Sequence, residues 1–177
     1  MTAIVLRPAG VADLATLAHW DRQPHVIAAL GDDAGIDWAD ELTRESDAQQ
    51  TLVAEIAGRP IGLVQIIDPA REETHYWGDI EPDLRAIDIW IGEEENLGRG
   101  YGTQMMELAL ARCFAAPAIE AVLIDPLASN ARARRFYERL GFIAVERRSF
   151  GSDDCMVYRL GRARWEARSP SRQPGRS

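Results

Sequence analysis

The pattern of apolar and polar positions along the chain predicts a mixed α/β domain. Apolar residues recur every three to four positions over 11–20, 103–114 and 129–140, which is the spacing of amphipathic helices. Shorter helices are expected within 21–35 and over 37–47. Runs rich in β-branched residues predict strands over 3–8, 85–92, 119–125, 142–150 and 154–160, and a hairpin over 51–68 that turns at Gly58-Arg59-Pro60.

The strand 85–92 shows the clearest alternation. Its two faces carry Ile87, Ile89 and Ile91 on one side and Ala86, Asp88 and Trp90 on the other. With the helix 103–114 and the continuously apolar strand 119–125 it forms a βαβ unit, which implies a parallel pair within a mixed sheet. We expect one α/β domain over 1–165 and a disordered tail over 166–177, which is rich in Pro, Ser and Arg.

The overall charge narrows the choice of partners. The chain has 177 residues, a formal net charge of −8 and a pI of about 4.9. Nucleic acid needs clustered cations and is not an expected partner, whereas a negative cleft would concentrate a cationic substrate. Acidity alone is equally explained by solubility. Short apolar runs, the absence of a signal-peptide pattern and the spacing of Cys113 and Cys155 favour a reduced, cytoplasmic setting without membrane, metal or disulfide.

Three glycines, Gly98, Gly100 and Gly102, stand immediately before the helix 103–114. They are explained by a simple turn, or by a loop that leaves backbone N–H groups free to bind a phosphate at the helix N-terminus. The loop lacks the Lys-Ser/Thr pair of a P-loop and the G-x-G-x-x-G spacing of a dinucleotide site. If the loop binds a phosphate, that phosphate belongs to a ligand other than those bound by a P-loop or a dinucleotide site.

A second motif, SNARARRFYERLGF over 129–142, gives this loop a meaning. Together the two motifs resemble those of the GNAT superfamily of acetyl-CoA-dependent N-acetyltransferases. The family's helix motif is matched at Asn130, Ala133, Tyr137, Arg139, Gly141 and Phe142. Its glycine loop, Q/R-x-x-G-x-G/A, is matched at Gly100 and Gly102, but Leu97 replaces the Gln or Arg that donates to the pyrophosphate.

The resemblance implies the GNAT acyl-CoA N-acyltransferase fold, whose two parallel strands separate at their C-terminal ends to admit the pantetheine arm. It also implies acetyl-CoA as cosubstrate and no metal. The residues expected to bind acetyl-CoA are Trp90, Ile91, Gly98, Arg99, Gly100, Tyr101, Gly102, Thr103, Asn130, Arg135 and Tyr137. By position alone, Tyr137 would be a half-buried aromatic residue of an amphipathic helix.

Most of the chain is similar to the aminoglycoside 6′-N-acetyltransferases, in segments such as HWDRQPHV, RPIGLVQ, DLRAID and LIDPLASN. This similarity implies direct acetyl transfer to the 6′-amine of an aminoglycoside within a ternary complex. The substrate-facing residues by position are Asp88, Asp125, Gln65, Glu73 (or its neighbour Glu72) and Trp77. The paired tryptophans of that family are Ala29-Leu30 here, so an aromatic wall is either lost or supplied by Trp38 or Trp77.

The expected chemistry assigns roles to the candidate site residues. An amine with a pKa near that of lysine, about 10.4, arrives protonated and must lose a proton before it attacks a thioester. Asp88 fits the base, Tyr137 the acid that protonates the departing thiolate, and a strand N–H near Trp90 the oxyanion donor. Alternatively, Asp88 is a strand-end carboxylate held by backbone N–H groups and Asp125 only forms a turn before Pro126.

Other acceptors share parts of the pattern. A siderophore-type acyltransferase would take hydroxylysine or hydroxyornithine derivatives. A protein N-acetyltransferase would need an open peptide groove, and the acidic loop 71–79 favours a small cation instead. A CoA-binding sensor without turnover is the non-enzymatic alternative, and both a monomer and a homodimer are compatible with the sequence.

Overall fold

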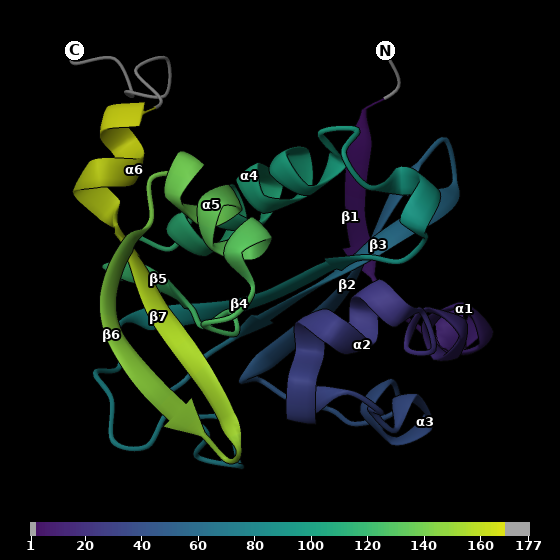
Figure 1. Cartoon of the computed structure of the whole chain (residues 1–177), viewed down its shortest axis with the longest axis horizontal. Helices are drawn as coiled ribbons and strands as arrows, with labels where there is room; N and C mark the ends of the chain where they lie inside the picture. Colours follow the sequence, from purple (N-terminus) through teal and green to yellow (C-terminus); the bar gives the residue numbers. More distant parts are fainter. Residues whose placement is uncertain (1–2, 169–177) are drawn as a thin grey trace.

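The computed structural model of the protein describes residues 3–168, apart from the side chain of Asp32. Seven strands form one sheet in the order β1-β2-β3-β4-β5-β7-β6 (Figure 1). The strands are β1 (Ile4–Pro8), β2 (Gln49–Ile56), β3 (Arg59–Ile67), β4 (Leu84–Ile91), β5 (Ala121–Ile124), β6 (Ile143–Phe150) and β7 (Asp153–Gly161). The α-helices are α1 (Leu14–Trp20), α2 (Pro24–Leu30), α3 (Trp38–Glu41), α4 (Tyr101–Phe114), α5 (Ala131–Arg139) and α6 (Arg162–Arg168), with 3-10 turns η1 (Val11–Asp13), η2 (Gly31–Asp33) and η3 (Glu94–Asn96).

The parallel pair expected from the βαβ unit is β4–β5, and the other neighbouring strands are antiparallel. The pairing of β4 with β5 runs only from Leu84↔Ala121 to Ala86↔Leu123, although β4 continues to Ile91. The two strands therefore separate toward their C-terminal ends. This confirms the mixed-sheet α/β fold and the separation that the GNAT resemblance implies.

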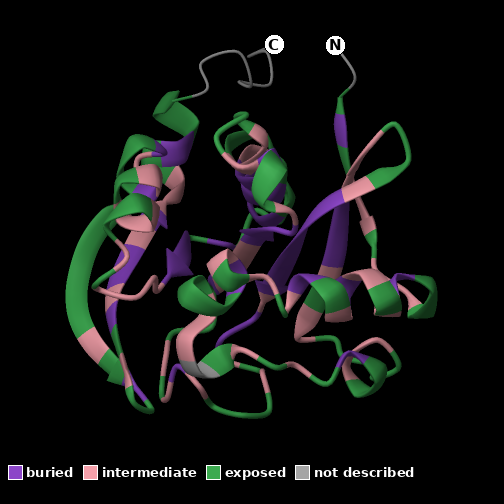
Figure 2. Cartoon of the chain, turned by 45° about the vertical axis from the view of Figure 1, so that its right-hand side comes forward, coloured by how far each residue is buried: buried purple, intermediate pink, exposed green. Residues whose placement is uncertain are grey.

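Helices cover both faces of the sheet (Figure 1). On one face, α4, α5 and α6 pack against side chains such as Ile87, Val122 and Leu160. On the other face, α1, α2 and α3 enclose a second apolar cluster that contains Trp20, Trp90 and Leu63. The loop 68–83 covers the remaining part of that face, where its Trp77 packs with β4, β5 and β7. The edge strand β6 is exposed over most of its length (Figure 2).

Two local expectations are wrong in detail. The helix expected over 37–47 is only α3, because the Thr43 hydroxyl bonds the carbonyls of Ala39 and Asp40 and closes the turn. The hairpin turns at Ala57-Gly58 rather than at Gly58-Arg59-Pro60, and Arg59 and Pro60 begin β3. Both turn residues have positive φ, 50° and 76°, which is the backbone of a two-residue hairpin turn.

The last element of the described residues is a helix that packs on the domain. Residues 162–168 form α6, whose Trp165 ring stacks on Phe114 with centroids 4.7 Å apart. Arg162 donates hydrogen bonds to the carbonyls of Phe114, Ala116 and Ile119. The expectation of a disordered tail over 169–177 lies outside the described residues. None of the helices within 3–168 has the length and apolar character needed to cross a membrane.

Candidate active site

The two central acids occupy equivalent positions on the parallel strands. Ala86 pairs with Leu123 at the last point of contact between β4 and β5. Asp88 lies two residues beyond Ala86, and Asp125 lies two residues beyond Leu123. Because side chains alternate along a strand, both carboxylates leave the sheet on the same face, at the mouth of the gap between the strands. The register thus explains why residues 37 positions apart in sequence lie together.

The proximity of these carboxylates changes their protonation. Burial, reinforced by the charge of Asp33, raises the pKa of Asp88 to about 6. Burial and then the charge of Asp88 raise the pKa of Asp125 to about 8, against the lowering effect of a hydrogen bond from Tyr76. Near neutral pH, the two buried carboxylates therefore carry less than two full negative charges until a cation approaches. One proton acceptor and one chargeable neighbour is an arrangement typical of acid–base sites.

Tyr137 belongs to the same site. It is buried on α5, the helix that follows β5, and its ring contacts Phe136, Phe142 and Tyr158. Burial raises the pKa of Tyr137, and the charges of Asp88 and Asp125 raise it further. The phenol therefore keeps its proton at neutral pH, as a general acid must.

The loop 68–83 contributes the aromatic side chain that contacts the acids, and it is Tyr76. Its hydroxyl donates a 2.6 Å hydrogen bond to Asp125 Oδ2, and its ring stacks on Phe150 with centroids 4.4 Å apart. Trp77, the expected substrate-facing residue, is buried with its ring edge-on to Tyr76 and Phe150, although it also lines the cavity described next. Trp38 does not form an aromatic wall, because it is buried against Trp90 and donates to Asp21.

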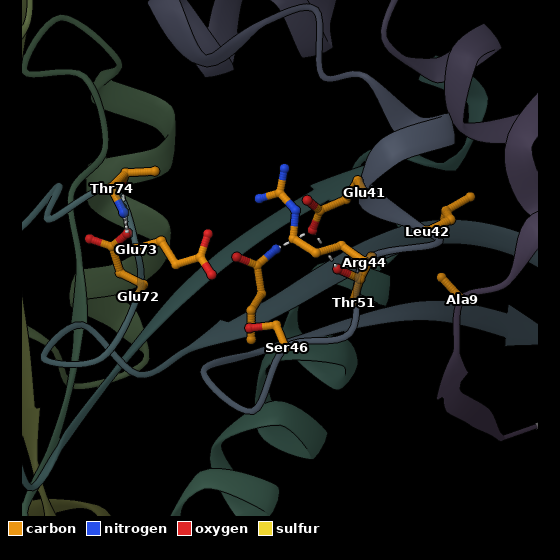
Figure 3. Close-up of a pocket in the computed structure, with 10 residues that line it drawn as sticks. Ala9, Glu41, Leu42, Arg44, Ser46, Thr51, Glu72, Glu73 and Thr74 are labelled. Carbon is orange, nitrogen blue, oxygen red and sulfur yellow. Dashed lines mark hydrogen bonds between the residues drawn. The ribbon is translucent and has the colours of Figure 1, made fainter.

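A cavity of about 310 Å³ opens in front of the acids. Its acidic lining residues are Asp33, Glu41, Glu72, Asp88 and Asp125. A second pocket of about 170 Å³ adjoins it between α3 and the loop 68–83, and Glu41, Gln49, Glu72 and Thr74 line both spaces (Figure 3). Carboxylates from five separate parts of the chain therefore surround one continuous space, which suits a ligand with several positive charges.

The two candidate loop acids behave differently. Glu72 accepts hydrogen bonds from the backbone N–H and hydroxyl of Thr74, at 2.7 and 2.6 Å, and from the backbone N–H of Tyr76. Glu73 is exposed and points from the loop toward the α3 side of the smaller pocket (Figure 3). The geometry thus makes Glu72 a brace that holds Tyr76 in place and leaves Glu73 facing the space.

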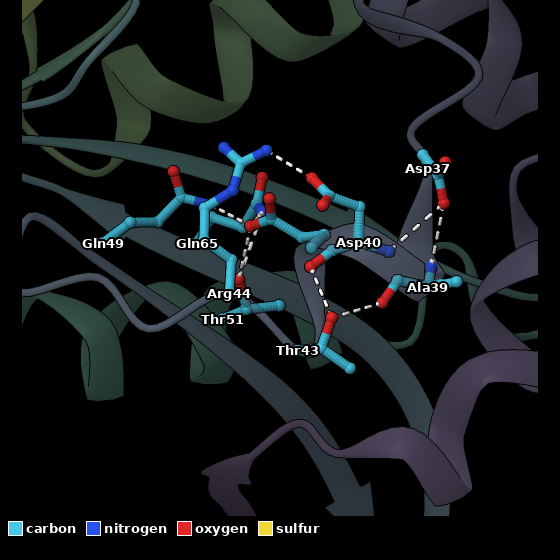
Figure 4. A network of polar contacts seen from close by, with 9 residues as sticks. Asp37, Ala39, Asp40, Thr43, Arg44, Gln49, Thr51 and Gln65 are labelled. Atoms are coloured by element: carbon cyan, nitrogen blue, oxygen red, sulfur yellow. Dashed lines mark hydrogen bonds and ion pairs between the residues drawn. The ribbon is translucent and has the colours of Figure 1, made fainter.

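Gln65 lies on the floor of the larger cavity. It is buried on β3 and is the direct cross-strand neighbour of Asp88 on β4. Its amide nitrogen donates to Glu41 Oε1 at 3.3 Å and to Thr51 Oγ1 at 3.2 Å (Figure 4). Gln65, Asp88 and Asp125, which come from three strands, are thus brought into one site.

The glycine loop has the shape of a phosphate cradle. Gly98 and Gly100 have φ of 71° and 78°, and a Cβ at either position would meet nothing within 4 Å. Gly100 is the N-cap of α4, a helix of 14 residues, and no side chain caps this helix. Bare N–H groups at the start of a long helix, facing open space, fit the pyrophosphate of a CoA thioester. Gly102 admits Phe136 of α5 at 3.6 Å from where its Cβ would lie.

The other residues expected at the CoA site lie in several different environments. Arg99 is exposed and folds back to donate to the Glu95 carbonyl at 2.7 Å. Asn130 caps α5 by accepting from the Ala133 N–H at 3.0 Å, which is a structural use of its side chain. Tyr101 and Thr103 lie in the first turn of α4, Arg135 is exposed on α5, and Trp90 and Ile91 end β4.

Sequence reasoning missed three side chains of this region. Asp33 and Glu41 carry no motif, and only the packing of η2 and α3 brings them to the cavity. His25 of α2 bonds the Ile91 carbonyl at 2.9 Å, and since a carbonyl only accepts, its Nε2 carries the proton. This bond ties α2 to the end of β4. Within residues 3–168 no group of three or more His, Cys, Asp or Glu side chains is placed to hold a metal ion.

Comparison with known proteins identifies the family of this chain. Residues 10–150 match the acetyltransferase (GNAT) domain family, so the chain belongs to the GNAT acetyltransferases. It is 28% identical over 148 residues to the aminoglycoside N(6′)-acetyltransferase type 1 of Klebsiella pneumoniae, across 79% of this chain and 74% of that protein. It is also 33% identical over 72 residues to a kanamycin resistance protein of Rhizobium radiobacter, across 40% of this chain and 67% of that protein.

Solved structures agree on the fold. The aminoglycoside acetyltransferase AAC(6′)-Ib in complex with coenzyme A superposes with a TM-score of 0.82 at 24% identity, over 96% of this chain and all of that one (100%). An aminoglycoside N(6′)-acetyltransferase of Legionella pneumophila superposes with a TM-score of 0.76 at 19% identity, over 95% and 97% of the two chains. The chain is therefore a GNAT acetyltransferase that resembles the aminoglycoside 6′-N-acetyltransferases.

Proposed function

We propose that the protein transfers the acetyl group of acetyl-CoA to an amine of a small polycationic acceptor, namely the 6′-amine of an aminoglycoside. The observation that carries this proposal is the set of carboxylates around Asp88 and Asp125, at the point where β4 and β5 separate. AAC(6′)-Ib, which superposes on this chain, has been solved with coenzyme A and kanamycin. Two relatives that are 28% identical over 148 residues are named for the same activity.

Each residue has a stated task in this proposal. The N–H groups of the loop 98–102 hold the pyrophosphate, and the gap between β4 and β5 receives the pantetheine arm. Acetyl-CoA, when bound, supplies an acetyl thioester at that gap. Asp88 accepts a proton from the acceptor ammonium, directly or through one water, so that the free amine attacks the thioester carbonyl. Tyr137 donates its phenolic proton to the departing CoA thiolate.

The remaining acids serve binding. The pKa of Asp125 is high because its charge is desolvated next to Asp88, so an approaching ammonium group compensates that charge and favours ionisation. Glu73 lies in the adjoining pocket and pairs with another ammonium group of the same molecule. The buried thiols of Cys113 and Cys155 take no part, because direct transfer needs no acetyl-enzyme.

The test is release of CoA thiol from acetyl-CoA by the purified protein with a panel of acceptors. The panel contains kanamycin, tobramycin, an aminoglycoside with a 6′-hydroxyl group, hydroxylysine and a short peptide. We expect turnover with the first two and none with the 6′-hydroxyl compound. Turnover only with hydroxylysine or with the peptide would overturn the acceptor and leave the acetyltransferase standing. Binding of CoA without turnover on any amine would identify a sensor.

A further inference from the structure

Glu41 lies where the cavity and the adjoining pocket meet, and three side chains donate to one of its oxygens. Glu41 Oε1 accepts from Thr51 Oγ1 at 3.2 Å, from Gln65 Nε2 at 3.3 Å and from Gln49 Nε2. The Thr51 hydroxyl also accepts from Gln65 Nε2 at 3.2 Å, which closes a triangle (Figure 4). α3 supplies the acceptor and β2 and β3 supply the donors, so the network joins the helix to the floor of the site.

The chemistry of this network fixes the orientation of the Gln65 amide. A carboxylate oxygen only accepts hydrogen bonds, so the side of the amide that faces Glu41 must be the NH₂ group. Gln65 Oε1 is left as the other end of the amide, and it has no hydrogen-bond partner among the described residues. Gln65 as a whole is only 6% exposed and lines the cavity. Gln65 Oε1 is not among the fully buried polar atoms, so a ligand or water in the cavity can donate a hydrogen bond to it.

The position of Gln65 indicates what its carbonyl oxygen binds. Gln65 is the cross-strand neighbour of Asp88, so its side chain leaves the sheet next to the carboxylate that takes the proton from the acceptor amine. A protonated amine, or a hydroxyl group next to it, has hydrogen-bond donors that need an acceptor at this point. If the amide were reversed, its NH₂ group would meet these donors and repel an ammonium group.

The geometry points to Glu41 as the positioning residue that holds Gln65 as a hydrogen-bond acceptor and so makes the site selective for ammonium-bearing acceptors. This role rests on the proposed function, because it concerns the same acceptor site. Glu41 acts through Gln65 rather than on the reacting atoms. Arg44 also lines the adjoining pocket but is paired with Asp40 on α3, so it does not neutralise Glu41 directly.

The experiment is a double-mutant cycle with Glu41→Leu and Gln65→Met. Glu45→Leu, an exposed glutamate four positions further on, is the matched control. We expect Glu41→Leu to raise the KM for the acceptor about tenfold, with kcat and the KM for acetyl-CoA within twofold of wild type. The double variant should have the acceptor KM of Gln65→Met alone, because Glu41 has nothing to position once the amide is gone. If the two effects multiply, or if Glu41→Leu leaves the acceptor KM unchanged, the role is disproved.

A second measurement tests the positioning without any turnover. The side-chain amide protons of Gln65 should exchange slowly in the ¹H–¹⁵N spectrum of the wild-type protein and rapidly in Glu41→Gln, a milder change that serves if Glu41→Leu does not fold. Slow exchange in both proteins would overturn the inference. If kanamycin is not acetylated while the Gln65 amide behaves as expected, the proposed substrate fails and the positioning by Glu41 stands.

Discussion

Asp88 and Asp125 lie two residues beyond the last β4–β5 pair, and this placement decides their protonation. A base must be ionised to accept a proton, and the pKa of Asp88 is raised to about 6. We therefore expect kcat/KM to fall as the pH is lowered through 6, and Asp88→Asn to lower kcat about 10²–10⁴-fold and remove this limb. Initial rates between pH 5 and 9 measure both, with the exposed loop residue Asp79→Asn as control. If the acidic limb of the pH profile persists in Asp88→Asn, another residue is the base.

The buried carboxylate of Asp125 lowers the stability of the fold by an amount that depends on pH. Its pKa rises from 3.8 to about 8 in the folded protein, so the folded state holds this proton more tightly than the unfolded chain. The resulting stabilisation is complete below pH 4 and is lost as the pH rises through 8. Asp125→Asn stays neutral, so its melting temperature should exceed that of the wild type by about 2–6 °C at pH 9 and by little at pH 4. A difference that does not change with pH in thermal melts would contradict this assignment.

The hydroxyl of Tyr76 donates a hydrogen bond to the Asp125 side chain. Tyr76→Phe removes this donor and keeps the ring that stacks on Phe150. Because the hydrogen bond lowers the pKa of Asp125, its loss makes that carboxylate harder to ionise. We expect the KM for the cationic acceptor to rise about three- to tenfold, with the KM for acetyl-CoA unchanged. Steady-state kinetics measure both values, and an equal rise in the two would instead indicate a distorted site.

At the scale of elements, the start of α4 makes a prediction about acetyl-CoA. Gly100 has φ of 78° and open space where a Cβ would lie, so Gly100→Val both strains the backbone and fills the cradle. Gly58 in the β2–β3 turn has φ of 76° and the same open surroundings, so Gly58→Val carries the same strain without touching the cradle. We expect calorimetry to show at least tenfold weaker CoA binding for Gly100→Val and unchanged binding for Gly58→Val. Equal affinities would remove the cradle from the CoA site.

The elements themselves were largely predictable, and the reasons are local. Strict alternation over 85–92 and the glycine turn before 103–114 both follow from the geometry of a single strand or helix. The failures occur where a side chain competes with the backbone, as Thr43 does at the end of α3, or where two positive φ angles shift a turn to Ala57-Gly58. The apolar contact of Trp165 with Phe114 could not be predicted, because it is not visible in a run of arginines.

The candidate site was predictable only where a motif or the register of a strand carries it. Asp88, Asp125 and Tyr137 follow from the two motifs and from a resemblance that spans most of the chain. Asp33 and Glu41 reach the cavity through the packing of short helices whose sequence has no site pattern. The contact of Tyr76 with Asp125 could not be predicted, because a loop gives no periodicity from which to read which ring faces inward.

At the scale of the whole molecule, the two substrates of the proposed reaction carry opposite charges, and the protein that binds them has a net charge of −8. A polycationic acceptor is attracted both by this net charge and by the carboxylates of the cavity. Acetyl-CoA is anionic and is repelled by the net charge, and in the proposed cradle the backbone N–H groups at the start of α4 would bind it. Added salt screens both effects, since the Debye length falls from about 10 Å at 0.1 M to about 3 Å at 1 M.

The two Michaelis constants should therefore respond to salt in opposite directions. Between 0.05 and 0.5 M NaCl we expect the KM for a tri- or tetracationic acceptor to rise about three- to tenfold. The KM for acetyl-CoA should stay constant or fall, because screening weakens a repulsion. Initial rates at fixed pH, with each substrate varied at saturating levels of the other, separate the two. A parallel rise of both constants would mean that salt acts on the enzyme as a whole, and that the carboxylates around Asp88 do not bind the acceptor by its charge.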